Sequence, residues 1–146
     1  MKKVAVIGSG SWGTALSTLL ASTSDEVVIW SREADVAESI NKEHVNCRHL
    51  SDSELPHNIV STTSEVEALI NVDAVVMAAP SAFLRYVCTA CAPYLDPQVD
   101  VLILSKGMEA GSHKLMHEVA IDELGNPARI AVLSGPNHAE EVIKQG

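Results

Sequence analysis

Apolar residues recur along this chain in two alternating patterns, short unbroken runs and stripes at helical spacing. The run Val4–Ile7 has no polar member, which is typical of a strand buried on both faces of a parallel sheet. After it, apolar residues recur at i, i+3, i+4, i+7 and i+8, namely Trp12, Ala15, Leu16, Leu19 and Leu20. That spacing predicts one buried face of a helix.

The same alternation continues along the rest of the chain. We expect strands at Lys3–Ile7, Glu26–Trp30, Ile59–Ser61, Asp73–Ala79, Val101–Leu104 and Arg129–Leu133. We expect helices at Ser11–Ala21, Asp35–Lys42, Val66–Ile70, Ala82–Ala92 and Lys114–Leu124. Repeated strand–helix units imply a mainly parallel sheet with right-handed crossovers, in the order 3-2-1-4-5-6. The prediction is a doubly wound, Rossmann-type α/β fold, with residues 1–146 as one domain.

The first strand and helix are joined by glycines at G-x-G-x-x-G spacing, Gly8, Gly10 and Gly13. In this context the first glycine permits a tight turn, the second lets a pyrophosphate approach the backbone, and the third lets the helix pack on the strand. The N-terminus of the helix then offers unpaired N–H groups to phosphates. The pattern predicts a dinucleotide site. A glycine-rich turn in another kind of α/β protein is the alternative.

The end of the second predicted strand bears on the choice of dinucleotide. Sites for NAD usually carry an acidic residue there, about 20 positions after the glycines. This chain has Arg32, followed by Glu33. A guanidinium can stack on adenine and pair with a 2′-phosphate, so Arg32 favours NADP or dual use over strict NAD. A solvated surface arginine is the alternative.

Composition limits the classes of partner. The 146 residues carry a formal net charge of −9, and only 3% are aromatic. An acidic chain with few stacking side chains argues against nucleic acid as a main partner. No apolar run approaches the roughly 18 residues of a membrane span. We expect a cytoplasmic protein without a membrane span.

Cysteines and histidines give no metal or redox signature. Cys88 and Cys91 form a lone C-x-x-C without a second pair. With Phe83, Leu84 and Val87 they fit one apolar helix face, so we expect buried core thiols. His113 and His117 have i, i+4 spacing but no further ligand, so we expect surface histidines and no metal site.

Four blocks together resemble the N-terminal part of bacterial-type NAD(P)-dependent glycerol-3-phosphate dehydrogenases. They are Gly8-Ser-Gly-Ser-Trp-Gly-Thr-Ala-Leu16, Trp30-Ser-Arg32, Leu104-Ser-Lys-Gly-Met-Glu109 and Leu133-Ser-Gly-Pro-Asn-His-Ala-Glu-Glu-Val142. The resemblance implies reversible reduction of dihydroxyacetone phosphate to sn-glycerol 3-phosphate with NADP or NAD, at the head of phospholipid synthesis.

The resemblance also implies roles for single residues. Besides the glycines, the matching cofactor positions are Ser11, Trp12, Arg32, His49, Lys106 and Ala139. The matching substrate positions are Lys106, Gly135 and Asn137. Asn137 stands where the family usually has serine, and an amide can still hydrogen-bond a substrate oxygen. His49 stands where the family has an aromatic residue.

Members of this family are roughly twice as long, and their second, helical domain supplies the catalytic lysine. We therefore expect this chain to be a fragment with no catalytic residue of its own, weak cofactor binding and little turnover. The alternatives are a dehydrogenase of the 6-phosphogluconate or ketopantoate type, and a redox-sensing nucleotide-binding module. An open sheet edge would favour a homodimer.

Overall fold

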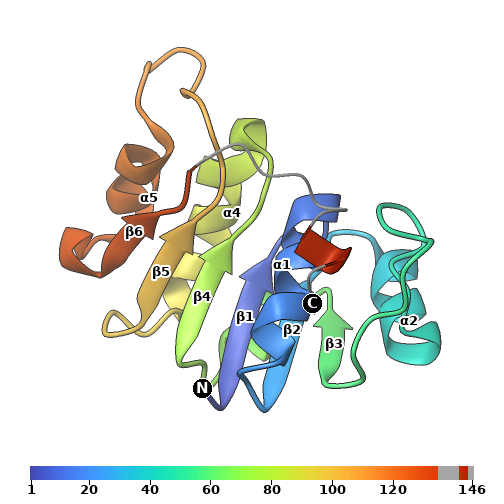
Figure 1. Cartoon of the computed structure of the whole chain (residues 1–146). Coiled ribbons are helices and arrows are strands. Elements are labelled where there is room, and N and C mark those ends of the chain that lie inside the picture. The colour runs from blue at the N-terminus through green and yellow to red at the C-terminus, as the bar shows by residue number, and fades with distance from the viewer. Residues whose placement is uncertain (135–141, 145–146) are drawn as a thin grey trace.

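The strands form one parallel sheet that runs through the molecule (Figure 1). The computed structural model describes residues 1–134 and 142–144. In these residues the sheet has six strands in the order β3-β2-β1-β4-β5-β6. They are β1 (Lys3–Ile7), β2 (Glu26–Trp30), β3 (Ile59–Thr62), β4 (Ala74–Met77), β5 (Asp100–Ile103) and β6 (Ile130–Val132). The predicted fold class and strand order are confirmed.

Helices cover both faces of the sheet (Figure 1). They are α1 (Ser11–Ala21), α2 (Ala34–Glu43), α3 (Glu65–Leu69), α4 (Leu84–Cys91) and α5 (Met116–Leu124). The described residues 142–144 are helical as well. Short 3₁₀ turns are η1 (Ser81–Phe83), η2 (Ala92–Tyr94) and η3 (Pro127–Arg129). No helix among the described residues is long and apolar enough to cross a membrane.

Each strand divides its side chains between two hydrophobic cores. Val4 and Val6 of β1 pack on the side of α1 and α2, while Ala5 and Ile7 pack on the side of α3, α4 and α5. All four side chains are fully buried. Because successive residues of a strand point to opposite faces, a strand covered on both sides must be apolar throughout. The unbroken apolar run of β1 therefore follows from its central place in the sheet.

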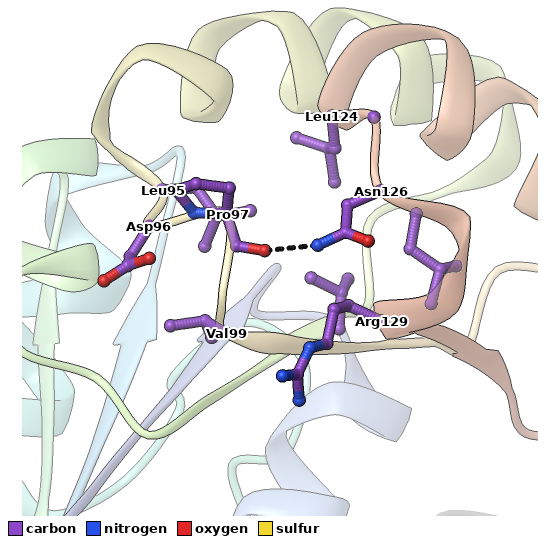
Figure 2. A pocket seen from close by; sticks show the side chains of 10 residues that line it. Leu95, Asp96, Pro97, Val99, Leu124, Asn126 and Arg129 are labelled. Atoms are coloured by element: carbon purple, nitrogen blue, oxygen red, sulfur yellow. Dashed lines mark hydrogen bonds between the residues drawn. The ribbon is translucent and has the colours of Figure 1, made fainter.

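At the amino edge of the sheet, a side-chain hydrogen bond joins the segments that lead into β5 and β6. Figure 2 shows a hollow there between the segments that lead into β5 and β6, with Asn126 pointing across it. Asn126 Nδ2 donates to the Pro97 carbonyl oxygen at 2.6 Å. The hollow measures about 10 Å³, which is room for about one water molecule. It ties two connections together and is too small for an organic ligand.

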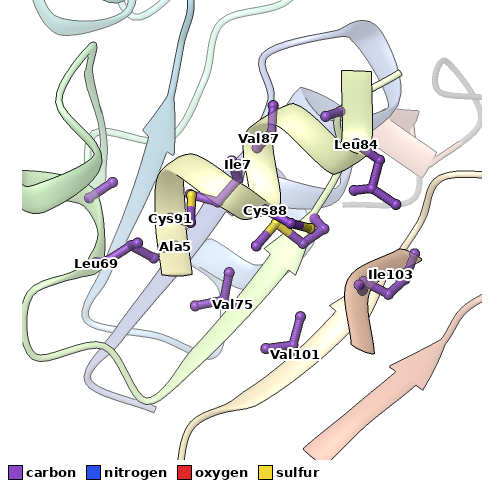
Figure 3. Packing of buried hydrophobic residues seen from close by; sticks show 14 of the residues in the cluster. Ala5, Ile7, Leu69, Val75, Leu84, Val87, Cys88, Cys91, Val101 and Ile103 are labelled. Carbon is purple, nitrogen blue, oxygen red and sulfur yellow. The ribbon is translucent and has the colours of Figure 1, made fainter. Parts of the chain in front are cut away.

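Helix α4 packs its two cysteines onto the sheet. Figure 3 shows Cys88 and Cys91 pointing from α4 toward the strands. Both thiols are free and fully buried, and burial raises the pKa of each to about 12. A buried, protonated thiol is a poor nucleophile, so both act as small apolar side chains. The prediction of buried core thiols is confirmed for this pair.

Two predictions about helix ends are wrong. Phe83 is 48% exposed, and it does not share the buried face of α4. It lies in the 3₁₀ turn η1, which has three residues per turn and therefore rotates Phe83 off that face. The helix predicted from Lys114 begins at Met116, because the preceding residues form a turn in which the Glu109 N–H donates to the Lys114 carbonyl oxygen at 2.8 Å.

Candidate functional site at the carboxyl edge

The turn after β1 is shaped by two glycines that touch backbone. Gly8 has φ +125°, and a Cβ there would lie 2.8 Å from the Ala78 carbonyl carbon. A Cβ at Gly13 would lie 2.8 Å from the Gly8 carbonyl oxygen and 2.9 Å from the Ala78 Cβ. Real Cβ atoms do not approach this closely. Both glycines are therefore required for the turn and for helix packing.

Gly10 differs from these two glycines. Its φ of −64° is open to any residue, and a Cβ there would meet no atom of the described residues within 4 Å. Gly10 is the N-cap of α1, and in the described chain no side chain caps this helix and no acid lies in its first turn. The first N–H groups of a helix have no partner within the helix. The start of α1 therefore offers both room beside Gly10 and N–H groups without a partner in the helix, and this combination suits the binding of an anion.

A cavity of about 760 Å³ opens at this turn. Its volume is in the range of cofactor and small-molecule sites. The lining comes from the segments that follow β1, β2 and β4, from the starts of α1, α3 and α4 and from one loop residue before β3. These residues are Gly8, Ser9, Gly10, Ser11, Trp12, Trp30, Arg32, Glu33, His49, Glu65, Ala78, Ala79, Pro80, Phe83, Tyr86 and Val87. Ligands of open α/β sheets bind at the carboxyl edge, where the strand order reverses. β1 and β4 are the strands at that point.

Most predicted cofactor residues meet at this cavity. Gly8, Gly10, Ser11, Trp12, Arg32 and His49 line it, and Gly13 lies beneath the turn against Gly8. Lys106 is exposed after β5 and lies outside the described lining. Ala139, Gly135 and Asn137 lie outside the described residues. The binding roles of all these residues remain predictions.

Sequence reasoning missed three residues of the site. Phe83 and Tyr86 are exposed aromatic side chains on the cavity wall, and the Arg32 guanidinium carbon lies 5.6 Å from the centre of the Phe83 ring. Asn46 is fully buried beneath the wall. A signal for Phe83 was present, since it follows Pro80-Ser81 at a strand end facing this edge. Nothing in the local sequence marks Asn46.

The loop that carries Lys106 is held by an ionic cluster around Arg85 of α4. Arg85 donates to both oxygens of Glu109, with Nε–Oε2 at 2.7 Å and Nη2–Oε1 at 2.9 Å. It also reaches Glu123 Oε1 at 2.7 Å and Asp122 Oδ2 at 3.1 Å, both on α5. Bidentate pairing of this kind fixes the geometry of a carboxylate. The cluster joins α4, α5 and the Lys106 loop.

These contacts shift the acid–base equilibria of the cluster. Hydrogen bonds from Arg85, and then from Ser112, lower the pKa of Glu109 from its ordinary value of 4.5 to about 2. Hydrogen bonds from Lys114 and Arg85 lower the pKa of Asp122. Both carboxylates are therefore charged at neutral pH, and each has a cationic partner. The Ser105 hydroxyl donates to the Ala79 carbonyl oxygen and joins the start of this loop to the cavity wall.

The described residues bring together no group of three His, Cys, Asp or Glu side chains that could hold a metal ion. His113 is exposed and has φ +61°, so it lies in the turn before α5 rather than on the helix with His117. The two rings therefore do not share one helix face. The i, i+4 spacing of the two histidines therefore does not correspond to one helical turn in the structure.

A parallel sheet in this order, with a glycine turn entering an uncapped helix at the strand reversal, defines the Rossmann class of α/β domains. Residues 3–146 match the family model described as NAD-dependent glycerol-3-phosphate dehydrogenase N-terminus. The chain belongs to this family.

Relatives agree with that assignment. The chain is 44% identical over 144 residues to a glycerol-3-phosphate dehydrogenase [NAD(P)+] of Streptomyces griseus, covering 98% of this chain and 43% of the relative. It is 43% identical to the enzyme of that name from Enterococcus faecalis, covering 97% and 42%. The crystal structure of glycerol-3-phosphate dehydrogenase from Coxiella burnetii superposes with a TM-score of 0.88 at 33% identity, covering 98% and 43%. The chain thus spans less than half the length of these relatives.

Proposed function

We propose that this chain binds NADP or NAD in the cavity at the glycine turn, as the cofactor domain of a glycerol-3-phosphate dehydrogenase. The observation that carries the proposal is Gly10. Gly8 and Gly13 are required by their contacts within the protein. Among the described residues, no atom lies within 4 Å of a Cβ at Gly10 and no side chain caps the helix that begins there. A glycine that the fold does not need is explained by a pyrophosphate that must approach its backbone.

The residues at the cavity fit such a cofactor. The first-turn N–H groups of α1, including those of Ser11 and Trp12, would hold the pyrophosphate. Arg32, at the end of β2 and beside Phe83, would meet the adenosine ribose and its 2′-phosphate. Glu33 adjoins Arg32 at the same rim, and its charge would moderate a preference for NADP over NAD.

The proposed reaction interconverts dihydroxyacetone phosphate and sn-glycerol 3-phosphate. The nicotinamide, when bound, supplies or accepts the hydride. In this chain we assign Lys106 to orient the substrate and place positive charge near its oxygens, with Gly135 and Asn137 as further substrate contacts. Lys106 is exposed on the loop after β5, whereas Gly135 and Asn137 lie outside the described residues. The proton donor, a lysine in the family, belongs to none of these positions.

Calorimetric titration tests the cofactor site directly. We expect the wild-type chain to bind NADPH and NADH, and Arg32→Ala to weaken NADPH binding about tenfold or more through loss of a charge-assisted hydrogen bond. NADH affinity should change much less, which makes NADH the internal control. Failure of the wild-type chain to bind either dinucleotide contradicts the proposed site. Equal losses for both dinucleotides contradict the role of Arg32 in selecting NADP.

Substrate specificity distinguishes the competing enzyme classes. Solved structures of ketopantoate reductase and octopine dehydrogenase share the fold at TM-scores of 0.65 and 0.61, with 16% and 23% identity. NADPH oxidation by the whole protein should be faster with dihydroxyacetone phosphate than with ketopantoate. A redox-sensing module would bind dinucleotide without turning over either substrate.

Three further points belong to the same proposal. Residues 1–146 would form one NAD(P)-binding domain, in a cytoplasmic protein that does not bind nucleic acid. In the described sheet β6 pairs with β5 alone, so its outer edge is open to a second copy. Homodimerisation through that edge predicts a dimeric mass in solution scattering. A monomeric mass contradicts it.

A further inference from the structure

The buried side chain of Asn46 joins two walls of the cavity. It lies in the connection between α2 and β3 and is fully buried. Within the described part of the chain, its side chain makes four hydrogen bonds, which go to the glycine turn, to α1 or to the backbone around His49. A buried amide in this position must have both its donors and its acceptor satisfied.

The amide NH₂ of the Asn46 side chain holds the glycine turn between β1 and α1 in place. Its Nδ2 donates to the Ser9 carbonyl oxygen at 2.7 Å and to Thr14 Oγ1 at 2.9 Å. The Thr14 hydroxyl donates to the same Ser9 carbonyl at 3.3 Å. Since C=O and N–H of one trans peptide point in opposite directions, fixing this carbonyl also directs the Gly10 N–H away from Asn46.

The carbonyl of the same amide holds His49. Asn46 Oδ1 accepts from the His49 N–H at 3.1 Å and from the Arg48 N–H at 3.3 Å. The Arg48 side chain is fixed in turn by Asp35 of α2, with Nε–Oδ2 at 2.8 Å. The chain therefore folds back over Asn46, and His49 lies on the cavity wall.

We propose that Asn46 is a positioning residue for the cofactor, which fixes the pyrophosphate-binding turn and, through the same amide, His49. This inference rests on the proposed function. Only an amide fits the contacts, because two donors face acceptors at one end and one acceptor faces two N–H groups at the other. A carboxylate would keep the contacts to the His49 loop but would face the Ser9 carbonyl without a donor.

The experiment compares Asn46→Asp with Asn58→Asp. Asn58 makes a similar pair of bonds at the other end of α1, with Nδ2 donating to the carbonyl oxygens of Ala21 at 2.8 Å and Ser24 at 3.0 Å. Each substitution removes an NH₂ group that donates two hydrogen bonds within the protein, so we expect both to lower the free energy of unfolding. Asn46→Asp alone changes the turn, which makes Asn58→Asp the matched control.

Two ligands separate positioning from a general loss of structure. NADPH contains the pyrophosphate, whereas adenosine 2′-phosphate lacks it. In the proposed site, adenosine 2′-phosphate would therefore contact the Arg32 side of the cavity and not the turn. Trp12 and Trp30, the two tryptophans of the chain, both line the cavity and report binding by fluorescence. Urea unfolding of each variant shows that the titrations are made on folded protein.

We expect Asn46→Asp to weaken NADPH binding by about tenfold or more while adenosine 2′-phosphate affinity stays within about twofold of wild type. Thr14→Val, which removes one partner of the amide with little change in size, should give the same pattern with a smaller loss. Asn58→Asp should leave both affinities unchanged.

Wild-type NADPH affinity in folded Asn46→Asp overturns the inference. So does an equal loss of both ligands in Asn46→Asp and Thr14→Val, since a disordered cavity would affect both. Binding of NADPH by the wild-type chain, measured in the same series, tests the proposed function separately. A wild-type chain that binds neither ligand overturns that function and this inference with it.

Discussion

The two sides of the carboxyl edge are held by different forces. At the glycine turn after β1, close backbone contacts and neutral buried hydrogen bonds set the shape, with Gly8, Gly13 and Asn46 as the main contributors. At the loop after β5, the partly exposed charges of Arg85 and Glu109 do so. Steric contacts and neutral bonds are insensitive to salt and pH, whereas exposed ion pairs depend on both. The comparison predicts opposite sensitivities for the two sides.

The largest effect is expected at the turn, from a single methyl group. Gly8→Ala would force a Cβ to within 3 Å of three backbone atoms at a positive φ. We expect it to lower the free energy of unfolding by about 3–5 kcal/mol, or to prevent folding. Urea unfolding followed by far-ultraviolet circular dichroism measures this. A loss below about 1 kcal/mol would mean that the backbone can move to accept the methyl group. Close contacts would then not be what fixes the glycine turn.

A smaller but salt-dependent effect is expected at the loop. Arg85→Met keeps an unbranched apolar stem but leaves Glu109, Asp122 and Glu123 close together without their shared cation. We expect Tm to fall on the order of 5 °C at low ionic strength. Added salt should reduce the difference from wild type, because it screens the repulsion among the carboxylates. A difference that does not change with salt contradicts an ionic origin.

The pH dependence of the loop follows from Glu109. Its folded pKa of about 2 lies below its ordinary value of 4.5, so the charged form stabilises the folded state. That contribution is fully present above pH 4.5 and is lost as the pH falls toward about 2. Glu109→Gln should therefore be less stable than wild type at neutral pH, and the two should converge across this window. Chemical unfolding at a series of pH values checks the convergence.

The smallest effect is expected from Ser112→Ala. The hydroxyl donates to Glu109 Oε1 at 2.6 Å and accepts from the Lys114 N–H at 3.2 Å, on an exposed turn. We expect a loss within about 0.5 kcal/mol and a modest rise in the pKa of Glu109. Carboxyl chemical shifts followed through an acid titration report that rise. A larger loss of stability would mean that Ser112, rather than Arg85, is the main residue that holds Glu109 and the loop in place.

How far the sequence predicts the structure depends on the range of the contacts. The bounds of β1, α1 and β2 agree with prediction, because apolar runs and glycines mark them locally. The prediction for Phe83 was wrong because a 3₁₀ turn is not visible in an apolar pattern. Asn46 could not be found, since its partners Ser9 and Thr14 lie 37 and 32 residues away.

The candidate site divides in the same way. The glycines and Arg32 follow from a motif with a known strand–turn–helix context. The structure places Gly8, Gly10 and Arg32 on one cavity, with Gly13 packed beneath the turn. The cluster around Arg85 joins residues 24 to 38 positions apart, and no spacing rule brings them together. The charge pattern of the sequence alone does not indicate which of the 19 acidic residues form ion pairs with a given arginine.

The most direct test of the central claim is NADPH titration of Gly10→Ala beside the wild-type chain. The added Cβ meets no atom of the described residues within 4 Å, so the free energy of unfolding should stay within about 1 kcal/mol of wild type. NADPH affinity should fall by at least about tenfold, because the methyl group occupies the path of the pyrophosphate. A stable Gly10→Ala chain that binds NADPH as tightly as wild type would contradict the assignment of this turn as the cofactor site.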